Sequence, residues 1–124
     1  MGIDIYIASS IEEPYKKSNL PHVRIEDNMQ EFIWKYRELF KESIQSYLEL
    51  EPYDNMILSK EQIMGLKIFA ENLLNPEKIC SLESEFDSYR YNLDKKDYLA
   101  FAKELYNLCQ EALKSNQDIV SLGD

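Results

Sequence analysis

Apolar residues recur at every third or fourth position through most of this 124-residue chain, and this spacing limits the possible folds more than any other feature. Such a period places the apolar side chains along one side of an α-helix, which needs a partner to cover them. The pattern predicts four amphipathic helices, over residues 28–50, 60–75, 76–89 and 94–116. Residues of good N-cap type stand directly before these segments: Asp27, Ser59, Asn75 and Asp94. Short connections between the helices favour an antiparallel four-helix bundle.

The first residues of the chain follow a different period. Ile3, Ile5 and Ile7 alternate with polar or small residues, which predicts a strand with the isoleucines on one face. Because a lone strand leaves its backbone groups unpaired, it needs a neighbour. Residues 20–26 (LPHVRIE) are the expected partner, 118–122 (DIVSL) are a second candidate, and a copy in a second subunit is a rival to both. We therefore expect an α+β fold, mostly α, in which the bundle carries a small two- or three-stranded sheet.

Length and charge narrow the choice further. A chain of this size forms one hydrophobic core, so we expect a single domain comprising residues 1–124. Its 14 basic and 23 acidic side chains give a formal net charge of -9. This charge repels a phosphate backbone, so nucleic acid is not an expected ligand, whereas basic proteins are expected partners.

The sequence favours a cytoplasmic location. Cys80 and Cys109 have neither the number nor the close spacing of a disulfide framework or a thiolate metal site. Asp4 interrupts the apolar stretch at the N-terminus, so no signal peptide is predicted. No run of residues reaches the ~20 apolar positions that span a bilayer, and we expect no membrane association.

Motifs for catalysis or cofactor binding are lacking in the sequence. Gly2, Gly65 and Gly123 are the three glycines, and they stand too far apart to build a phosphate-binding loop or a dinucleotide fingerprint. A single histidine, His22, would have to serve any nucleophilic mechanism. The sequence therefore predicts no cofactor, no metal and no catalytic residue, and it argues against an enzyme.

Four polar side chains nevertheless define a candidate ligand site. If residues 3–8 pair with 22–26, the face opposite the isoleucines carries Asp4, Tyr6, His22 and Arg24. An acid, a phenol, an imidazole and a guanidinium together could bind an anion or transfer a proton. The simpler interpretation is a solvated sheet face with a cross-strand Asp4–Arg24 pair that contributes less than ~1 kcal/mol.

A second candidate site lies in the segment 83–91 (ESEFDSYRY). Its members are Glu83, Glu85, Asp87, Tyr89 and Tyr91. The three acids have no base between them, and tyrosine is enriched among the residues that dominate binding energy in protein interfaces. This combination suits a basic protein partner. The alternative is that Tyr89 packs inward with Phe86 while the acids are merely solvated.

The richness in Lys, Ile, Asn and Tyr is similar to that of proteins from AT-rich bacterial genomes. In that setting a small acidic helical chain resembles, in its role, the antidote or immunity proteins that neutralise toxins. The resemblance implies a non-catalytic, protein-binding module, a monomer or homodimer, that blocks a basic toxin or another basic partner by electrostatic steering and docking through tyrosines. The alternative function is a small-molecule or anion-binding domain, an enzyme among the options, that uses the Asp4 face of the sheet.

Overall fold

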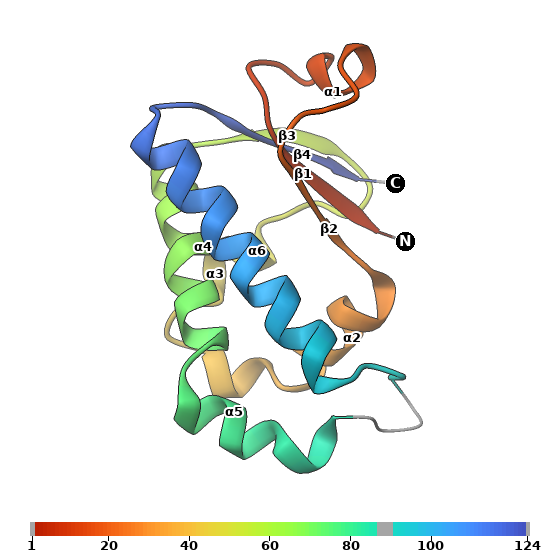
Figure 1. Cartoon of the computed structure of the whole chain (residues 1–124), viewed down its shortest axis with the longest axis vertical. Helices are drawn as coiled ribbons and strands as arrows, with labels where there is room; N and C mark the ends of the chain where they lie inside the picture. Colours follow the sequence, from red (N-terminus) through yellow and green to blue (C-terminus); the bar gives the residue numbers. More distant parts are fainter. Residues whose placement is uncertain (1, 87–90, 124) are drawn as a thin grey trace.

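The computed structural model describes residues 2–86 and 91–123. Its fold is α+β and mostly helical, with a four-stranded antiparallel sheet at one end and the helices extending away from it (Figure 1). The strands are β1 (Ile3–Ile7), β2 (His22–Ile25), β3 (Asn55–Leu58) and β4 (Ile119–Gly123). The α-helices are α1 (Glu13–Lys16), α2 (Asp27–Lys35), α3 (Gln45–Leu48), α4 (Lys60–Leu73), α5 (Pro76–Leu82) and α6 (Lys95–Lys114). The described residues also form two 3-10 helices, η1 (Arg37–Phe40) and η2 (Glu83–Glu85). Within the described ranges, no helix combines the length and apolar character needed to cross a membrane.

The sheet has the strand order β2-β1-β4-β3, and each neighbouring pair is antiparallel. The predicted pairing of β1 with β2 is confirmed, with Ile5 opposite Val23. The second candidate partner pairs as well, on the other edge of β1, where Ile5 lies opposite Ser121. The expected two- or three-stranded sheet is therefore too small. Both candidates pair with β1 at once, and β4 adds a fourth strand, β3, from a segment predicted as a loop.

The two faces of the sheet are buried by different parts of the chain. The isoleucines of β1 point into the main core together with side chains of the helices, as their alternation predicts. On the opposite face a smaller apolar cluster forms around Val120 and Leu122, to which Ile11 and Leu20 contribute from either side of α1. β4 is thus bordered by strands on both edges and covered by side chains on both faces.

The segment predicted as one helix over residues 28–50 is divided into α2, η1 and α3. The reason is packing. Phe32 stacks on Phe86 with 5.5 Å between ring centroids, whereas Tyr47 packs on Phe69 of α4 at 5.0 Å. A straight helix would separate Phe32 and Tyr47 by ~22 Å along one axis. The breaks let both rings enter the same core.

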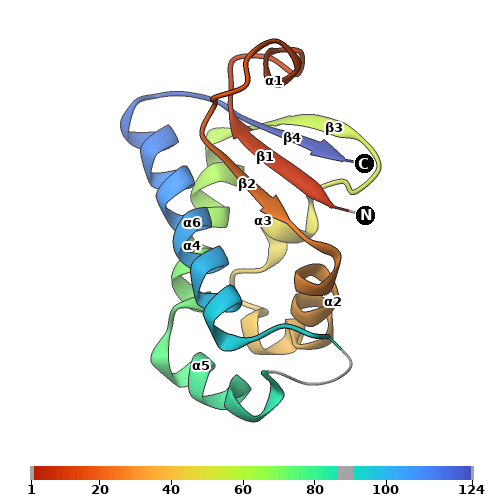
Figure 2. The same ribbon diagram turned by 45° about the vertical axis from the view of Figure 1, so that its right-hand side comes forward.

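α4 and α6 form the main helix pair and lie side by side in opposite directions (Figures 1 and 2). Their predicted N-caps are present. Ser59 and Gln62 form a reciprocal capping box, and the Asp94 side chain accepts a hydrogen bond from the backbone N–H of Asp97. The other predicted bundle helices are short: α2 follows the end of β2, and α5 lies at the end of the molecule remote from the sheet (Figure 2). The helical part is therefore one antiparallel pair with shorter helices around it, rather than four equivalent bundle helices.

Candidate functional site

α6 carries two exposed stripes of opposite charge. Asp97, Glu104 and Glu111 are separated by seven residues, nearly two helical turns, so their side chains leave the helix on the same side. At 1.5 Å per residue, the three positions span ~21 Å. Lys96 and Lys103 each precede one of these acids and form a second stripe, turned by about 100° around the helix. The acids and the lysines thus occupy separate flanks of α6.

The acidic stripe lines one wall of a groove between α6 and β2, two elements that run beside each other (Figures 1 and 2). Three adjoining pockets of about 270, 260 and 440 Å³ follow one another along it; residues of β2 line the first two, and residues from 7–21, before β2, line the third. Glu104 lines the first and second pockets, and Glu111 lines the second and third, so each pocket shares a wall with the next. We call this surface the acidic groove. Its carboxylates belong to Glu13, Glu26, Asp97, Glu104, Glu111 and Asp118.

Two basic side chains that line the groove are paired with carboxylates. The guanidinium of Arg24 lies 3.1 Å from Glu26, and the Lys17 ammonium lies 2.9 Å from Glu13. The backbone N–H of Ser9 also donates to Glu13, and this hydrogen bond, together with Lys17, lowers the pKa of the Glu13 carboxyl. These two carboxylates therefore carry little uncompensated charge.

The acids of the α6 stripe are not paired with basic side chains in this way. Within residues 2–86 and 91–123, no ion pair involves Asp97, Glu104 or Glu111. All three side chains are exposed. Their negative charge is thus directed to solvent, or to a molecule that docks in the groove.

The acids of the predicted partner-binding segment 83–91 have partners in the protein itself. Glu83 pairs with Lys95 at 2.9 Å. Glu85 accepts a hydrogen bond from the hydroxyl of Tyr36. Their proposed contact with a partner protein stays a prediction, and it would have to compete with these contacts.

The tyrosines of the same segment do not form an exposed pair in the described structure. Tyr91 is 7% exposed and packs edge-on against Phe32, with 5.8 Å between ring centroids. Asp87 and Tyr89 lie outside the described residues. Tyr91 is therefore turned inward, whereas the alternative stated for Tyr89 concerns a residue outside the described ranges.

The second predicted set comes together on the outer face of the sheet. Asp4 lies opposite Arg24 and Tyr6 lies opposite His22. The Asp4 carboxylate lies 3.0 Å from Nε2 of His22 and 2.6 Å from a guanidinium nitrogen of Arg24, and the Tyr6 ring stacks on the imidazole at 4.7 Å. Burial and the nearby Asp4 raise the pKa of the Tyr6 phenol. The basic groups thus face a carboxylate of their own sheet, and a ligand-binding role for this set stays a prediction.

Metal binding finds no support in the described part of the chain, where no group of three His, Cys, Asp or Glu side chains is arranged to hold an ion. Within the stripe, neighbouring acids are ~10 Å apart along the helix. This spacing suits several separate basic side chains rather than one cation.

The acidic groove was not predicted from the sequence. In the sequence, each acid of α6 is indistinguishable from an ordinary solvated residue. The β2 residues that form the opposite wall are far from α6 in the sequence. The repeat of acids at positions 97, 104 and 111 was the available signal, because it is the spacing that aligns side chains on a helix.

No protein-family model matches the chain, and no curated protein matches it. Among solved structures, the chain is similar to the Neisseria DNA mimic protein DMP12, with a TM-score of 0.54 and 15% sequence identity. The likeness covers 98% of this chain and 99% of that protein. The two proteins share a fold. At this identity the likeness concerns the fold and carries no individual residue across.

This likeness corrects the expectation about the partner. A basic toxin or another basic protein was expected on charge alone. The protein that shares the fold is described as a DNA mimic, so the finding points to partners that bind DNA rather than to a toxin or to any protein chosen for its basic charge. The expectation that the chain does not itself bind nucleic acid is compatible with the likeness.

Proposed function

We propose that this protein binds a DNA-binding protein at the surface where that protein holds DNA. The acidic groove takes the place of the DNA backbone. The observation that carries the proposal is the stripe of Asp97, Glu104 and Glu111, which are exposed and form no ion pair within the described ranges. The fold shared with a DNA mimic protein supports the proposal independently of this stripe.

The acidic groove carries a charge density somewhat below that of one DNA strand. A strand carries one phosphate per ~3.4 Å of helix axis, which gives about six charges over the ~21 Å of the stripe. Six carboxylates line the groove, but Glu13 and Glu26 are paired with Lys17 and Arg24, which leaves four: Asp97, Glu104, Glu111 and Asp118. A protein that grips one strand through a row of lysines and arginines would meet a large part of that charge here.

Binding of this kind requires no chemical step. Exposed carboxylates attract a basic surface over about one Debye length, ~8 Å at physiological salt, and so raise the rate of association. α6 is a 20-residue helix with buried residues along its length, so the spacing of the stripe is set before binding. Little conformational entropy is then lost on docking. The partner is left unable to hold DNA at the same surface.

An immunity role is the special case in which the DNA-binding partner is a toxic nuclease. The DNA cleft of such an enzyme is basic, and occupation of the cleft by the acidic groove would block cleavage. The same residues would serve a non-toxic DNA-binding partner. Whether the protein has an immunity role therefore depends on the activity of its partner and not on its own surface.

The test begins with DNA-binding proteins and asks which surface of the chain retains them. Proteins of the source cell that bind DNA-cellulose are eluted and passed over immobilised wild type, a groove variant and a control variant. The groove variant carries Asp97→Asn, Glu104→Gln and Glu111→Gln. The control carries Glu61→Gln, Glu71→Gln and Glu77→Gln, which remove the same charge from exposed positions of α4 and α5.

We expect the wild type and the control to retain the same DNA-binding protein, and duplex DNA to release it. The groove variant should retain at least tenfold less, since three charge contacts of ~0.5 kcal/mol or more are lost. Retention of nothing by the wild type, or equal retention by the groove variant and the control, would contradict the proposal.

A further inference from the structure

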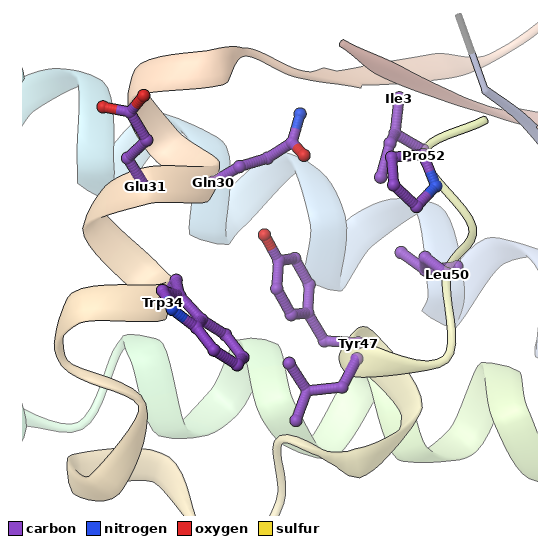
Figure 3. Close-up of a pocket in the computed structure, with 8 residues that line it drawn as sticks. Ile3, Gln30, Glu31, Trp34, Tyr47, Leu50 and Pro52 are labelled. Carbon is purple, nitrogen blue, oxygen red and sulfur yellow. The ribbon is translucent and has the colours of Figure 1, made fainter. Parts of the chain in front are cut away.

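A separate pocket of about 330 Å³ lies between α2, α3 and the first residue of β1, Ile3 (Figure 3). Its lining is mostly apolar and aromatic: Ile3, Trp34, Tyr47, Leu48, Leu50 and Pro52, with Gln30 and Glu31 as the polar members. α2 contributes to both surfaces from opposite sides of the helix. Gln30, Glu31 and Trp34 line this pocket, whereas Asn28 and Met29 line the acidic groove. We call it the Tyr47 pocket.

Tyr47 is the unusual member of this lining. Its side chain is 8% exposed, and its ring packs on Phe69 at 5.0 Å. In Figure 3 the ring stands between Trp34 on one side and Leu50 and Pro52 on the other, and the hydroxyl points into the pocket. Burial raises the pKa of this phenol, so it stays protonated at neutral pH. Within the described ranges the hydroxyl makes no hydrogen bond to the protein, and it is not one of the buried polar atoms without a partner, so its oxygen is open to solvent or to a ligand in the pocket.

The walls of the pocket favour a planar cation. Trp34 is 56% exposed, and the guanidinium carbon of Arg37 already lies 4.0 Å from the centre of its ring. This contact is a cation–π contact, in which Arg37 itself covers one face of the indole and leaves the other face for a second group. Glu31 is the one charged residue of the lining, and its sign is negative. An anion would be repelled by Glu31, and a purely apolar group would leave the Tyr47 hydroxyl unpaired.

We propose that the Tyr47 pocket receives an arginine side chain of the protein partner. The aliphatic part of the side chain would lie against the apolar wall, while the guanidinium stacks on an aromatic ring and donates to the Tyr47 hydroxyl oxygen, and the exposed Glu31 carboxylate at the rim attracts its charge. Arginine suits this pocket better than lysine, because its flat, weakly hydrated group stacks on aromatic rings and donates in several directions. The inference rests on the proposed function, since surfaces that bind DNA are rich in arginine.

The test uses the isolated chain and short peptides, so it can fail independently of the groove experiment. Trp34 is the one tryptophan of the sequence, and its fluorescence therefore reports on the pocket directly. The capped peptide Ac-Ala-Arg-Ala-NH2 is titrated against its citrulline analogue, which has nearly the same shape without charge, and against a leucine analogue. Free L-arginine is the fourth ligand.

We expect a saturable fluorescence change with the arginine peptide and at least about fivefold weaker binding of the citrulline peptide, since a charge-assisted hydrogen bond becomes a neutral one. Tyr47→Phe and Glu31→Gln should each weaken arginine-peptide binding by about fivefold. Because Glu31 is exposed, Glu31→Gln reports on the pocket without disturbing the core. The matched controls Tyr15→Phe and Glu71→Gln, at exposed positions outside the pocket, should keep the wild-type affinity.

Four outcomes would overturn the inference. Absence of saturable binding would show that the pocket takes no arginine. Equal binding of the leucine or citrulline peptide would show that charge is not recognised. Tighter binding of free arginine than of the peptide would make this a metabolite site. A fluorescence change with protein concentration alone would assign the pocket to a second copy of the chain.

Discussion

The hydroxyl of Tyr98 donates a hydrogen bond to the carbonyl oxygen of Leu73, across a distance of 2.8 Å. Tyr98 lies in the first turn of α6 and Leu73 is the last residue of α4, so this bond joins the two main helices at the end remote from the sheet. A carbonyl in the last turn of a helix has no partner within the helix. The tyrosine thus satisfies a group that would otherwise be buried without a hydrogen bond.

Replacing Tyr98 by Phe should destabilise the protein by ~1–2 kcal/mol, because the Leu73 carbonyl loses its partner while the ring contacts remain. Urea unfolding measures the loss. Tyr106→Phe, on the same helix, is the matched control, since no hydrogen bond of its hydroxyl is seen within the described ranges. Equal stability of the two variants would show that the Tyr98 bond contributes nothing.

Gly65 in the middle of α4 allows α3 to approach closely. A Cβ at this position would overlap the hydroxyl of Ser46 and lie 2.8 Å from its Cβ. Alanine normally stabilises a helix relative to glycine, but Gly65→Ala should cost ~1–3 kcal/mol here because α3 must move. In a double-mutant cycle, Ser46→Gly should be less harmful in the Gly65→Ala variant than in the wild type. Additive effects, or a more stable Gly65→Ala variant, would refute the close contact.

Stability should fall at alkaline pH because of Cys109. Burial raises the pKa of this thiol from its ordinary value of 9.0 to about 12, although Lys67 opposes the shift. Above the unfolded-state pKa, the unfolded chain releases a proton that the folded chain retains, so unfolding becomes easier as pH rises and no effect of this group is expected at neutral pH. The loss is about 1.4 kcal/mol between about pH 8 and pH 10.

Urea midpoints across this pH range check the alkaline prediction. Cys109→Ala should show a shallower decline than the wild type, whereas Cys80→Ala, at an exposed thiol, should decline as the wild type does. Parallel curves for all three proteins would mean that Cys109 does not titrate differently in the two states.

A further prediction concerns phosphate binding at the outer face of the sheet, where Asp4 contacts His22 and Arg24. Because Asp4 engages both His22 and Arg24, inorganic phosphate should not raise the melting temperature of the wild type beyond a chloride control of equal ionic strength. Asp4→Asn should cost no more than ~1 kcal/mol and should gain a phosphate response. Asp54→Asn, at an exposed acid outside this set, should gain none. Stabilisation of the wild type by phosphate, lost in Asp4→Asn, would instead favour the anion-binding alternative.

Local patterns predicted the parts of the fold that depend on neighbouring residues. The alternation at Ile3, Ile5 and Ile7 identified β1 and its partner β2, and Ser59 and Asp94 marked the starts of α4 and α6. These features depend on strand period and capping, which short stretches of sequence contain.

The errors arose where distant packing decides the structure. Phe32, Tyr36 and Phe40 have helical spacing, and this spacing does not indicate where the helix ends. The chain bends because Phe32 packs on Phe86 and Phe40 packs on Phe69, two rings that are distant in sequence. β3 has four residues inside an apparent loop and becomes a strand because β4 offers it an edge. The acidic groove likewise depends on β2 lying beside α6.

The central place of β4 in the sheet has a consequence for biosynthesis. β4 is the neighbour of both β1 and β3, yet it is made of residues 119–123. While the ribosome is still translating α6, β3 has no strand beside it and one edge of β1 stays open. The nascent chain must therefore leave the backbone groups of β3 and of one edge of β1 without strand partners until these residues emerge, a state in which such edges can pair with other chains.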